Sequence, residues 1–118
     1  MKNKLETLLH SENNVCFAYL FGSYADDTFT DKSDLDVAVY LKDFSLDEKL
    51  SLHHILEKSL QKNVDLLCLN EVKNIYLLEA IITGGLVIKE STERDIFEVK
   101  TQHSIIDFKY FRKYIDAA

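Results

Sequence analysis

Apolar and polar positions along the chain follow two periods, which predict an alternation of helices and strands. Apolar residues recur every three or four positions in segments 2–11, 45–62, 71–83 and 92–116, which predicts amphipathic helices. Unbroken or alternating apolar runs predict strands at 15–21, 34–41, 64–69 and 86–88. Residues 24–33 are mostly small and polar, which indicates one helical turn and a loop. This order predicts an α/β domain with a mixed β-sheet, helices packed against it and a long C-terminal helix.

Individual residues refine the ends and the buried faces of these helices. Ser45 followed by Glu48 forms a capping box that opens the second helix. We expect that helix to bury one apolar stripe, made of Leu46, Leu50, Leu56 and Leu60. The third helix should end with Gly84 as its C-cap. Its inward side chains should be Ile75, Leu78, Ile81 and Ile82.

Length and composition indicate a single globular domain over residues 1–118. The net charge of −6 favours a protein partner, or a small anion neutralised by metal ions, over direct binding to nucleic acid. Residues 1–14 lack the apolar core of a signal peptide. No apolar stretch approaches the ~20 residues needed to span a membrane. We therefore expect a cytoplasmic protein without membrane contacts, with Cys16 and Cys68 as reduced core residues.

A pair of acids at the start of a strand is the first candidate for chemistry. Gly22-Ser23 ends one apolar strand, and Asp34-Leu35-Asp36 opens the next strand after a ten-residue spacer. Alternate residues of a strand point to the same face, so Asp34 and Asp36 project together with Cα atoms roughly 6.6 Å apart. Paired acids repel each other unless a cation lies between them, and Mg²⁺ and Mn²⁺ prefer carboxylate oxygens as ligands. The pair is a candidate site for two metal ions, which lie ~3.5–4 Å apart in phosphoryl-transfer enzymes.

A third acid and a glycine turn add to this candidate site. Asp65 is the only charge in the apolar run VDLLCL, where a buried carboxylate needs a metal, a cation or a hydrogen-bond cage. Gly22 allows a ligand to approach the backbone, and Ser23 offers donors to phosphate oxygens. Each feature alone has an ordinary structural interpretation: a surface acid pair, a hydrogen-bonded core Asp, or a simple turn. Their occurrence together, in this order, favours a metal-dependent phosphate site.

The same residues carry a resemblance to a known family. The chain resembles the nucleotidyltransferase superfamily that includes DNA polymerase beta, in the segments FGSYADDTFTDKSDLDVAV and VDLLCL. That superfamily has Gly-Ser, a ten-residue spacer, Asp-x-Asp on the next strand and a third Asp on a later strand. The resemblance covers residues 15–90 and, more weakly, the N-terminal helix. Within the superfamily, the length and the wording LFGSYA, SDLDVAVYL and ITGG resemble the minimal nucleotidyltransferases, which are the antitoxins of HEPN/MNT toxin–antitoxin modules.

The resemblance implies a polymerase beta-like nucleotidyltransferase core and an activity. The activity would be transfer of AMP from ATP to a tyrosine of a cognate HEPN ribonuclease toxin, which neutralises the toxin. Gly22 and Ser23 would hold the triphosphate of ATP. Asp34 and Asp36 would bind both Mg²⁺ (or Mn²⁺) ions, and Asp65 would bind the ion that activates the nucleophile. One departure is Asp26-Asp27, where many relatives carry Arg-Gly, so a cation is replaced by negative charge.

Two other functions stay open at this point. The first is nucleotidyl transfer to a small molecule or an RNA end, although larger relatives with that activity generally add a substrate-binding domain. The second is a non-catalytic partner that binds a nucleotide or neutralises a toxin without turnover, which the Asp26-Asp27 departure would suit.

The terminal helix also has two interpretations. It combines three basic residues, Lys109, Arg112 and Lys113, with a larger set of apolar and aromatic residues: Ile105, Phe108, Tyr110, Phe111, Tyr114 and Ile115. These side chains either pack on the sheet or form an exposed face that contacts the partner protein.

Overall fold

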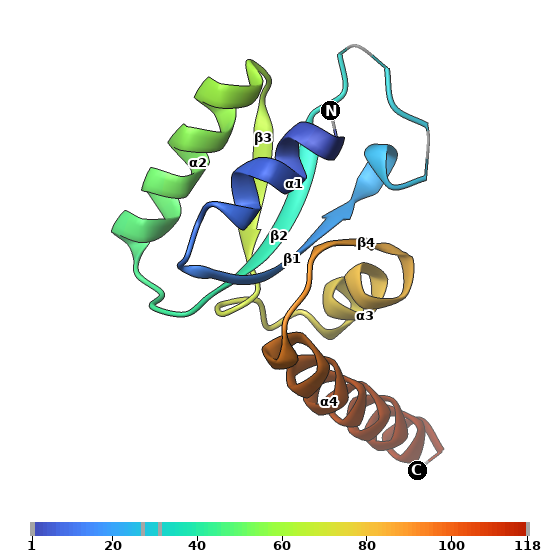
Figure 1. Cartoon of the computed structure of the whole chain (residues 1–118). Helices are drawn as coiled ribbons and strands as arrows, with labels where there is room; N and C mark the ends of the chain where they lie inside the picture. The colour runs from blue at the N-terminus through green and yellow to red at the C-terminus, as the bar shows by residue number, and fades with distance from the viewer. Residues whose placement is uncertain (1, 27, 31, 118) are drawn as a thin grey trace.

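The computed structural model describes residues 2–26, 28–30 and 32–117, and these residues form a four-stranded sheet flanked by helices (Figure 1). The elements in chain order are α1 (Lys2–His10), β1 (Val15–Phe21), the 3₁₀ turn η1 (Gly22–Tyr24), β2 (Leu35–Leu41), α2 (Leu46–Leu60), β3 (Val64–Cys68), α3 (Ile75–Gly84), β4 (Leu86–Lys89) and α4 (Thr92–Ala117). The predicted order and the α/β class with a mixed sheet are confirmed.

The topology of the sheet brings the end of β1 and the starts of β2 and β3 to the same side of the sheet. The spatial order of the strands is β3-β2-β1-β4. β1 is antiparallel to both β2 and β4, whereas β2 and β3 are parallel. As a result β1 ends, and β2 and β3 begin, at the same edge, which is the upper edge in Figure 1. This edge carries the predicted functional residues.

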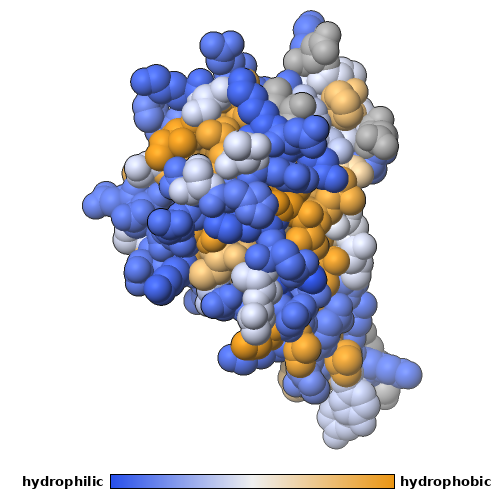
Figure 2. Space-filling view, viewed as in Figure 1, coloured by the Kyte–Doolittle hydropathy of each residue, from blue (hydrophilic) through white to orange (hydrophobic). Residues whose placement is uncertain are grey.

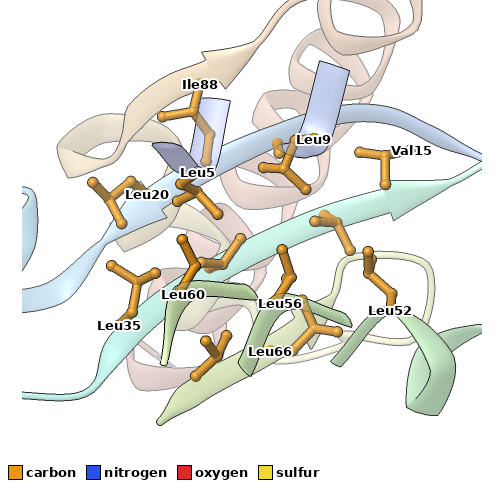
Figure 3. Close-up of a cluster of buried hydrophobic side chains, with 14 of the residues drawn as sticks. Leu5, Leu9, Val15, Leu20, Leu35, Leu52, Leu56, Leu60, Leu66 and Ile88 are labelled. Carbon is orange, nitrogen blue, oxygen red and sulfur yellow. The ribbon is translucent and has the colours of Figure 1, made fainter. Parts of the chain in front are cut away.

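The two faces of the sheet have separate apolar clusters. α1 and α2 cover one face, where Leu5 and Leu9 of α1 and three leucines of α2 pack on the strands (Figure 3). α3 and α4 pack against the other face around a cluster that contains Phe17, Tyr19, Ala38, Leu69, Leu78 and Ile81. A fully buried Leu side chain contributes roughly 1.5–3 kcal/mol to stability, so these two layers hold the sheet between them.

The buried stripe of α2 differs from the expected one. The helix begins after Ser45 as predicted, because the Ser45 side chain accepts a hydrogen bond from the Glu48 backbone N–H. The buried residues, however, are Leu52, Leu56 and Leu60, whereas Leu46 and Leu50 are exposed. At 100° per residue, Leu46 and Leu50 lie roughly 80–120° around the helix from Leu56, which turns them away from the sheet. Their assignment to the core was wrong.

α3 starts later and ends one residue later than predicted. The Asn74 side chain accepts hydrogen bonds from the backbone N–H groups of Tyr76 and Leu77, so it caps a helix that begins at Ile75 rather than at 71. The C-cap is Gly85, not Gly84. A Cβ atom on Gly85 would lie 2.5 Å from the Ile81 carbonyl oxygen, so glycine is needed there. Leu78 and Ile81 are buried as expected, and Ile75 and Ile82 are half-buried.

α4 gives the molecule its elongated shape. The helix has 26 residues, and its C-terminal half extends away from the sheet at the bottom of Figure 1. The molecule measures 52 × 32 × 23 Å along its principal axes. Within the described part of the chain, no helix has the length and apolar character that crossing a membrane requires.

Candidate functional site

The structure brings Asp34, Asp36 and Asp65 together at the edge where β2 and β3 begin. Asp36 on β2 is the register partner of Asp65 on β3 and of Phe21 at the end of β1. Asp34 directly precedes β2 and lies on the same side as Asp36, because Leu35 between them points into the opposite apolar cluster. In Figure 1, α3 and α4 lie toward the other end of the strands, so they leave this corner uncovered.

The surroundings of Asp65 correct one expectation. The sequence indicated a carboxylate buried within an apolar run, but Asp65 is exposed and its neighbours Val64 and Leu66 are buried. β3 is one of the two edge strands of the sheet, and α2 covers the face of Val64 and Leu66. Asp65 lies on the other face, where Leu67, two residues further on, packs against the second apolar cluster. Burial therefore gives no reason to expect a metal ion at Asp65, whereas its register pairing with Asp36 does.

Gly22 lies against the central carboxylate. Its backbone adopts φ +72°, a conformation that residues with a side chain rarely adopt. A Cβ atom at this position would lie 2.1 Å from Oδ2 of Asp36, so only glycine leaves room for that carboxylate. The turn η1 starts at Gly22, two residues before the predicted helical turn. The glycine thus places the start of a 3₁₀ turn, whose first amides have no acceptor within the turn, directly beside Asp36.

The electrostatics of the site centre on Asp36. Partial burial raises the pKa of its carboxyl group, and the negative charges of Asp65 and Asp34, with a hydrogen bond to the Asp65 side chain, raise it further. A carboxylate held beside two others gains from any cation placed among them. The three acids therefore form a site with an unbalanced negative charge.

The donor set can be tested against a divalent metal ion. Within the described residues, no trio of His, Cys, Asp or Glu side chains already converges on a single ion position. Mg²⁺ in phosphoryl-transfer sites, however, is held by only one or two carboxylates, and substrate phosphates and water complete its shell. The pair Asp36 and Asp65, with Asp34 beside it, fits ions that share their coordination with a nucleotide.

The loop after the glycine turn contains hydrogen bonds between its own residues. The Asp26 carboxylate accepts hydrogen bonds from the backbone N–H and the hydroxyl of Thr28. Asp27, the second residue of the Asp26-Asp27 departure, lies outside the described residues. Tyr24 packs partly against the α1–α2 apolar cluster and stacks on Phe29 with ring centroids 4.3 Å apart, which is a packing role.

Sequence reasoning missed an open hollow of about 520 Å³ that adjoins Asp34. Its lining comes from the residues before β2, from the end of α2 and from the turn before β3: Lys32, Ser33, Asp34, Glu57, Gln61, Lys62 and Asn63. The Lys62 ammonium lies 5.3 Å from the centre of the Tyr24 ring, and Tyr24 follows Ser23. The sequence alone indicates that Lys32 is near Asp34, because the two are only two residues apart. It does not indicate that Lys62 is near Asp34, because the parallel pairing of β2 with β3 brings Lys62 to the hollow.

α4 presents a second notable surface. One side of the helix faces the molecule: Thr101 and Ile105 are buried, the Arg112 guanidinium donates a hydrogen bond to the Tyr76 hydroxyl, and Lys109 forms a 2.7 Å ion pair with Glu79. An exposed apolar stripe lies on the roughly opposite side at 100° per residue. It consists of Ile96, Val99, Ile106, Tyr110 and Tyr114. Figure 2 shows apolar side chains along this lower part of the molecule.

Comparison with known proteins gives one consistent result. The family model described as polymerase beta, nucleotidyltransferase matches residues 3–94. The chain is similar to the protein adenylyltransferase MntA of Shewanella oneidensis, with 30% identity over 103 residues, 85% of this chain and 73% of that protein.

Solved structures agree with this match. The chain is similar to a toxin–antitoxin structure with AMP-PNP, with a TM-score of 0.80, 28% identity and coverage of 98% of this chain and 95% of that one. It is also similar to a chain of a tri-AMPylated Shewanella oneidensis HEPN toxin in complex with an MNT antitoxin, with a TM-score of 0.73, 27% identity and coverage of 98% and 92%.

Proposed function

This chain belongs to the polymerase beta nucleotidyltransferase family, and from that premise we propose that it is an antitoxin that transfers AMP from ATP to a tyrosine of a partner HEPN toxin. The observation that carries the proposal is the position of Asp36, which lies between Asp65 and a glycine turn that leaves room for its carboxylate. Relatives described as a protein adenylyltransferase and as partners of a HEPN toxin support the choice of acceptor.

The three acids are proposed to hold two Mg²⁺ or Mn²⁺ ions together with ATP. Asp34 and Asp36 would contact both ions, and Asp65 would contact the ion on the acceptor side. When bound, such ions neutralise phosphate charge and lower the pKa of the attacking hydroxyl. The contribution of the protein is to hold carboxylate oxygens on one rigid sheet edge, so that little reorganisation is needed when ATP binds.

Gly22 and Ser23 are proposed to hold the triphosphate. The first amides of a 3₁₀ turn have no acceptor within that turn, so they can donate to phosphate oxygens, and the Ser23 hydroxyl adds one more donor. Because Gly22 lies against Asp36, phosphates held by this turn would lie next to the carboxylates.

The proposed reaction is a displacement at the α-phosphorus of ATP. The acceptor tyrosine oxygen forms a bond to the α-phosphorus while the bond from that phosphorus to the oxygen shared with the β-phosphate breaks. Pyrophosphate leaves with the bonding electron pair, and the tyrosine proton is released to water. In-line displacement would require the acceptor oxygen opposite the pyrophosphate, and we assign the acceptor side to Asp65, which is exposed on an edge strand.

α4 is proposed to dock the partner. A helix that is apolar on two opposite sides is normally covered on both, and only one side of α4 faces this molecule. The relatives whose structures cover nearly all of this chain are described as toxin–antitoxin complexes, so the toxin is the proposed occupant of the second side.

The direct test follows the α-phosphate of ATP. The chain is incubated with Mg²⁺ and with the protein encoded beside it, using ATP labelled in either the α- or the γ-phosphate. Label should reach the partner only from the α-position. Asp36→Asn should slow transfer at least about a hundredfold, which corresponds to about 2.7 kcal/mol in the barrier.

Asp47→Asn is the matched control, because Asp47 is exposed in the first turn of α2. It should leave transfer close to that of the wild type. If Asp36→Asn transfers label at the wild-type rate, the metal ions are bound elsewhere. A partner that stays unlabelled while it binds the wild-type chain would favour a non-catalytic neutralising role.

A further inference from the structure

The start of β3 has backbone groups that point away from the sheet. β3 is an edge strand, and its pairing with β2 begins where the Leu35 N–H donates to the Asn63 carbonyl oxygen at 3.0 Å. Successive strand residues turn their backbone groups to opposite sides, so the N–H and C=O of Val64 point away from β2. On that side the described sheet has no further strand. An open strand edge leaves such donors and acceptors without a ladder partner.

Two side chains of α2 bind both outward groups of Val64. The Glu57 carboxylate accepts a hydrogen bond from the Val64 N–H at 2.9 Å. His53 Nε2 lies 2.7 Å from the Val64 carbonyl oxygen, and because a carbonyl only accepts, Nε2 is the donor. The two residues are four positions apart, so they lie on one face of the helix, with His53 Nε2 3.5 Å from the Glu57 carboxylate. Together they take the place of a neighbouring strand at this one residue.

These bonds act on the residue directly before Asp65. The Asp65 side chain is hydrogen-bonded to that of Asp36 across the β2–β3 pair, and two carboxylates repel each other when both are ionised. β3 is paired on one side only, and backbone near the end of an element opens more easily than the core of a sheet. The repulsion would therefore move the start of β3 outward, and the bonds to Val64 oppose that shift.

We propose that His53 and Glu57 are positioning residues for Asp65, because they bind the preceding backbone unit and so hold the start of β3 against β2. The inference rests on the proposed function and deepens it, since it gives two residues outside the three acids a part in metal coordination. Glu57 also lines the hollow described above, but its role here is that of a hydrogen-bond acceptor and does not require its charge.

The test measures Mn²⁺ binding to the whole chain with a saturating non-hydrolysable ATP analogue, with free Mn²⁺ followed by electron paramagnetic resonance. His53→Ala and Glu57→Ala should each weaken the binding of one ion by about tenfold, as expected when the support of a metal ligand is lost. Glu57→Gln should stay within about twofold of the wild type, because its amide oxygen can accept from Val64. His54→Ala is the matched control, since it removes the adjacent, exposed histidine, and should leave Mn²⁺ binding unchanged.

A double-mutant cycle tests whether His53 acts through Asp65. Asp65→Asn removes a charged ligand and should itself weaken Mn²⁺ binding. Adding His53→Ala to that variant should weaken binding by less than about twofold more, whereas independent effects would multiply. One hydrogen bond is a small part of the stability of a domain, so the alanine variants should remain folded, with Tm lowered by a few degrees.

Several results would overturn the inference. Alanine variants that lower Tm but bind Mn²⁺ as the wild type does would make the bonds to Val64 a support of the fold alone. Equal losses in Glu57→Gln and Glu57→Ala would mean that the charge of Glu57 acts on the ions. Multiplying effects in the double variant, or wild-type binding by Asp65→Asn, would separate His53 from Asp65. A wild-type chain that binds no Mn²⁺ beyond that held by the free ATP analogue would contradict the proposed function itself.

Discussion

Gly22 and Asp36 are in such close contact that the backbone of one limits where the carboxylate of the other can lie. Oδ2 of Asp36 occupies the space that a Cβ atom of residue 22 would need, and Gly22 has a positive φ. One residue therefore serves two purposes: it lets the chain turn from β1 into η1, and it leaves room for the central acid. A change at Gly22 should act on stability and on chemistry at once.

We expect Gly22→Ala to destabilise the fold by roughly 1–3 kcal/mol, because a side chain at this φ is strained. The displaced Asp36 carboxylate should also lower AMP transfer at least tenfold, on the order of 1.4 kcal/mol in the barrier. Chemical denaturation and the transfer assay measure the two effects. Gly84→Ala is the control, because no atom lies within 4 Å of its added Cβ atom and it is in a helix, where alanine should be neutral or stabilising. Equal stability of both variants would contradict the contact with Asp36.

Asp36 should destabilise the metal-free protein. Its pKa in the fold is raised, so ionisation costs stability above that pKa, and the cost disappears as pH falls below the ordinary value of 3.8. Asp36→Asn should therefore raise Tm by a few degrees at about pH 8 in the presence of a chelator, while it abolishes transfer. The gain should shrink as the pH is lowered. Asp47→Asn, which removes a favourable charge from the first turn of α2, should not raise Tm. A lower Tm for Asp36→Asn would show that Asp36 stabilises the fold.

At the scale of elements, α4 differs most from a simple packing helix. Ile105 and the Arg112 and Lys109 side chains attach it to the molecule, mainly to α3. The sequence left open whether the apolar and aromatic residues of segment 105–115 pack or are exposed, and the structure divides them: Ile105 is buried, whereas the aromatic residues of this segment and Ile115 are exposed. The basic residues of α4 do not distinguish packing from partner binding, because Lys109 and Arg112 contact residues of α3.

Tyr110→Ala with Tyr114→Ala tests the docking role of α4. The two side chains are 74% and 71% exposed, so their loss should leave Tm unchanged. Aromatic anchors of an interface each cost about 2 kcal/mol or more when truncated, so Kd for the partner should rise at least about thirtyfold. Isothermal titration calorimetry gives Kd, and ATP binding should be unaffected.

Phe44→Ala provides the comparison for this experiment, because Phe44 is also an exposed aromatic but precedes α2. It should leave Kd unchanged. Wild-type affinity in the α4 variant would assign the exposed stripe to something other than the partner, and a large fall in Tm would make it part of the fold.

At the scale of the whole molecule, the order of elements could be predicted, because the period of the apolar residues reports helix and strand directly. β1 was predicted at its observed bounds, and the strand that carries Asp36 was predicted to begin one residue before its observed start at Leu35. Exposure could not be predicted in the same way. Asp65 lies in an apolar run and Leu50 at helical spacing from other leucines, yet both are exposed, because the order of strands and the rotation of α2 depend on tertiary packing.

The hollow beside Asp34 was beyond prediction for a similar reason. Lys32 and Lys62 are thirty positions apart in the sequence and line one hollow because β2 and β3 run parallel and begin at one edge. Parallel strands need a crossover connection, which here is the helix α2. The crossover returns the chain to the side where β2 begins, so the residues at both strand starts become neighbours.

The central claim is that Asp34, Asp36 and Asp65 form one site that a divalent metal ion and ATP complete together. Thermal unfolding of the chain alone, with Mg²⁺, with ATP and with both tests it most directly. We predict that Tm rises more with both ligands than the sum of the separate shifts, because metal and triphosphate complete each other's coordination. Asp36→Asn should remove this extra rise. No shift with Mg²⁺ or Mn²⁺ and any nucleoside triphosphate, or a full shift in Asp36→Asn, would contradict the account.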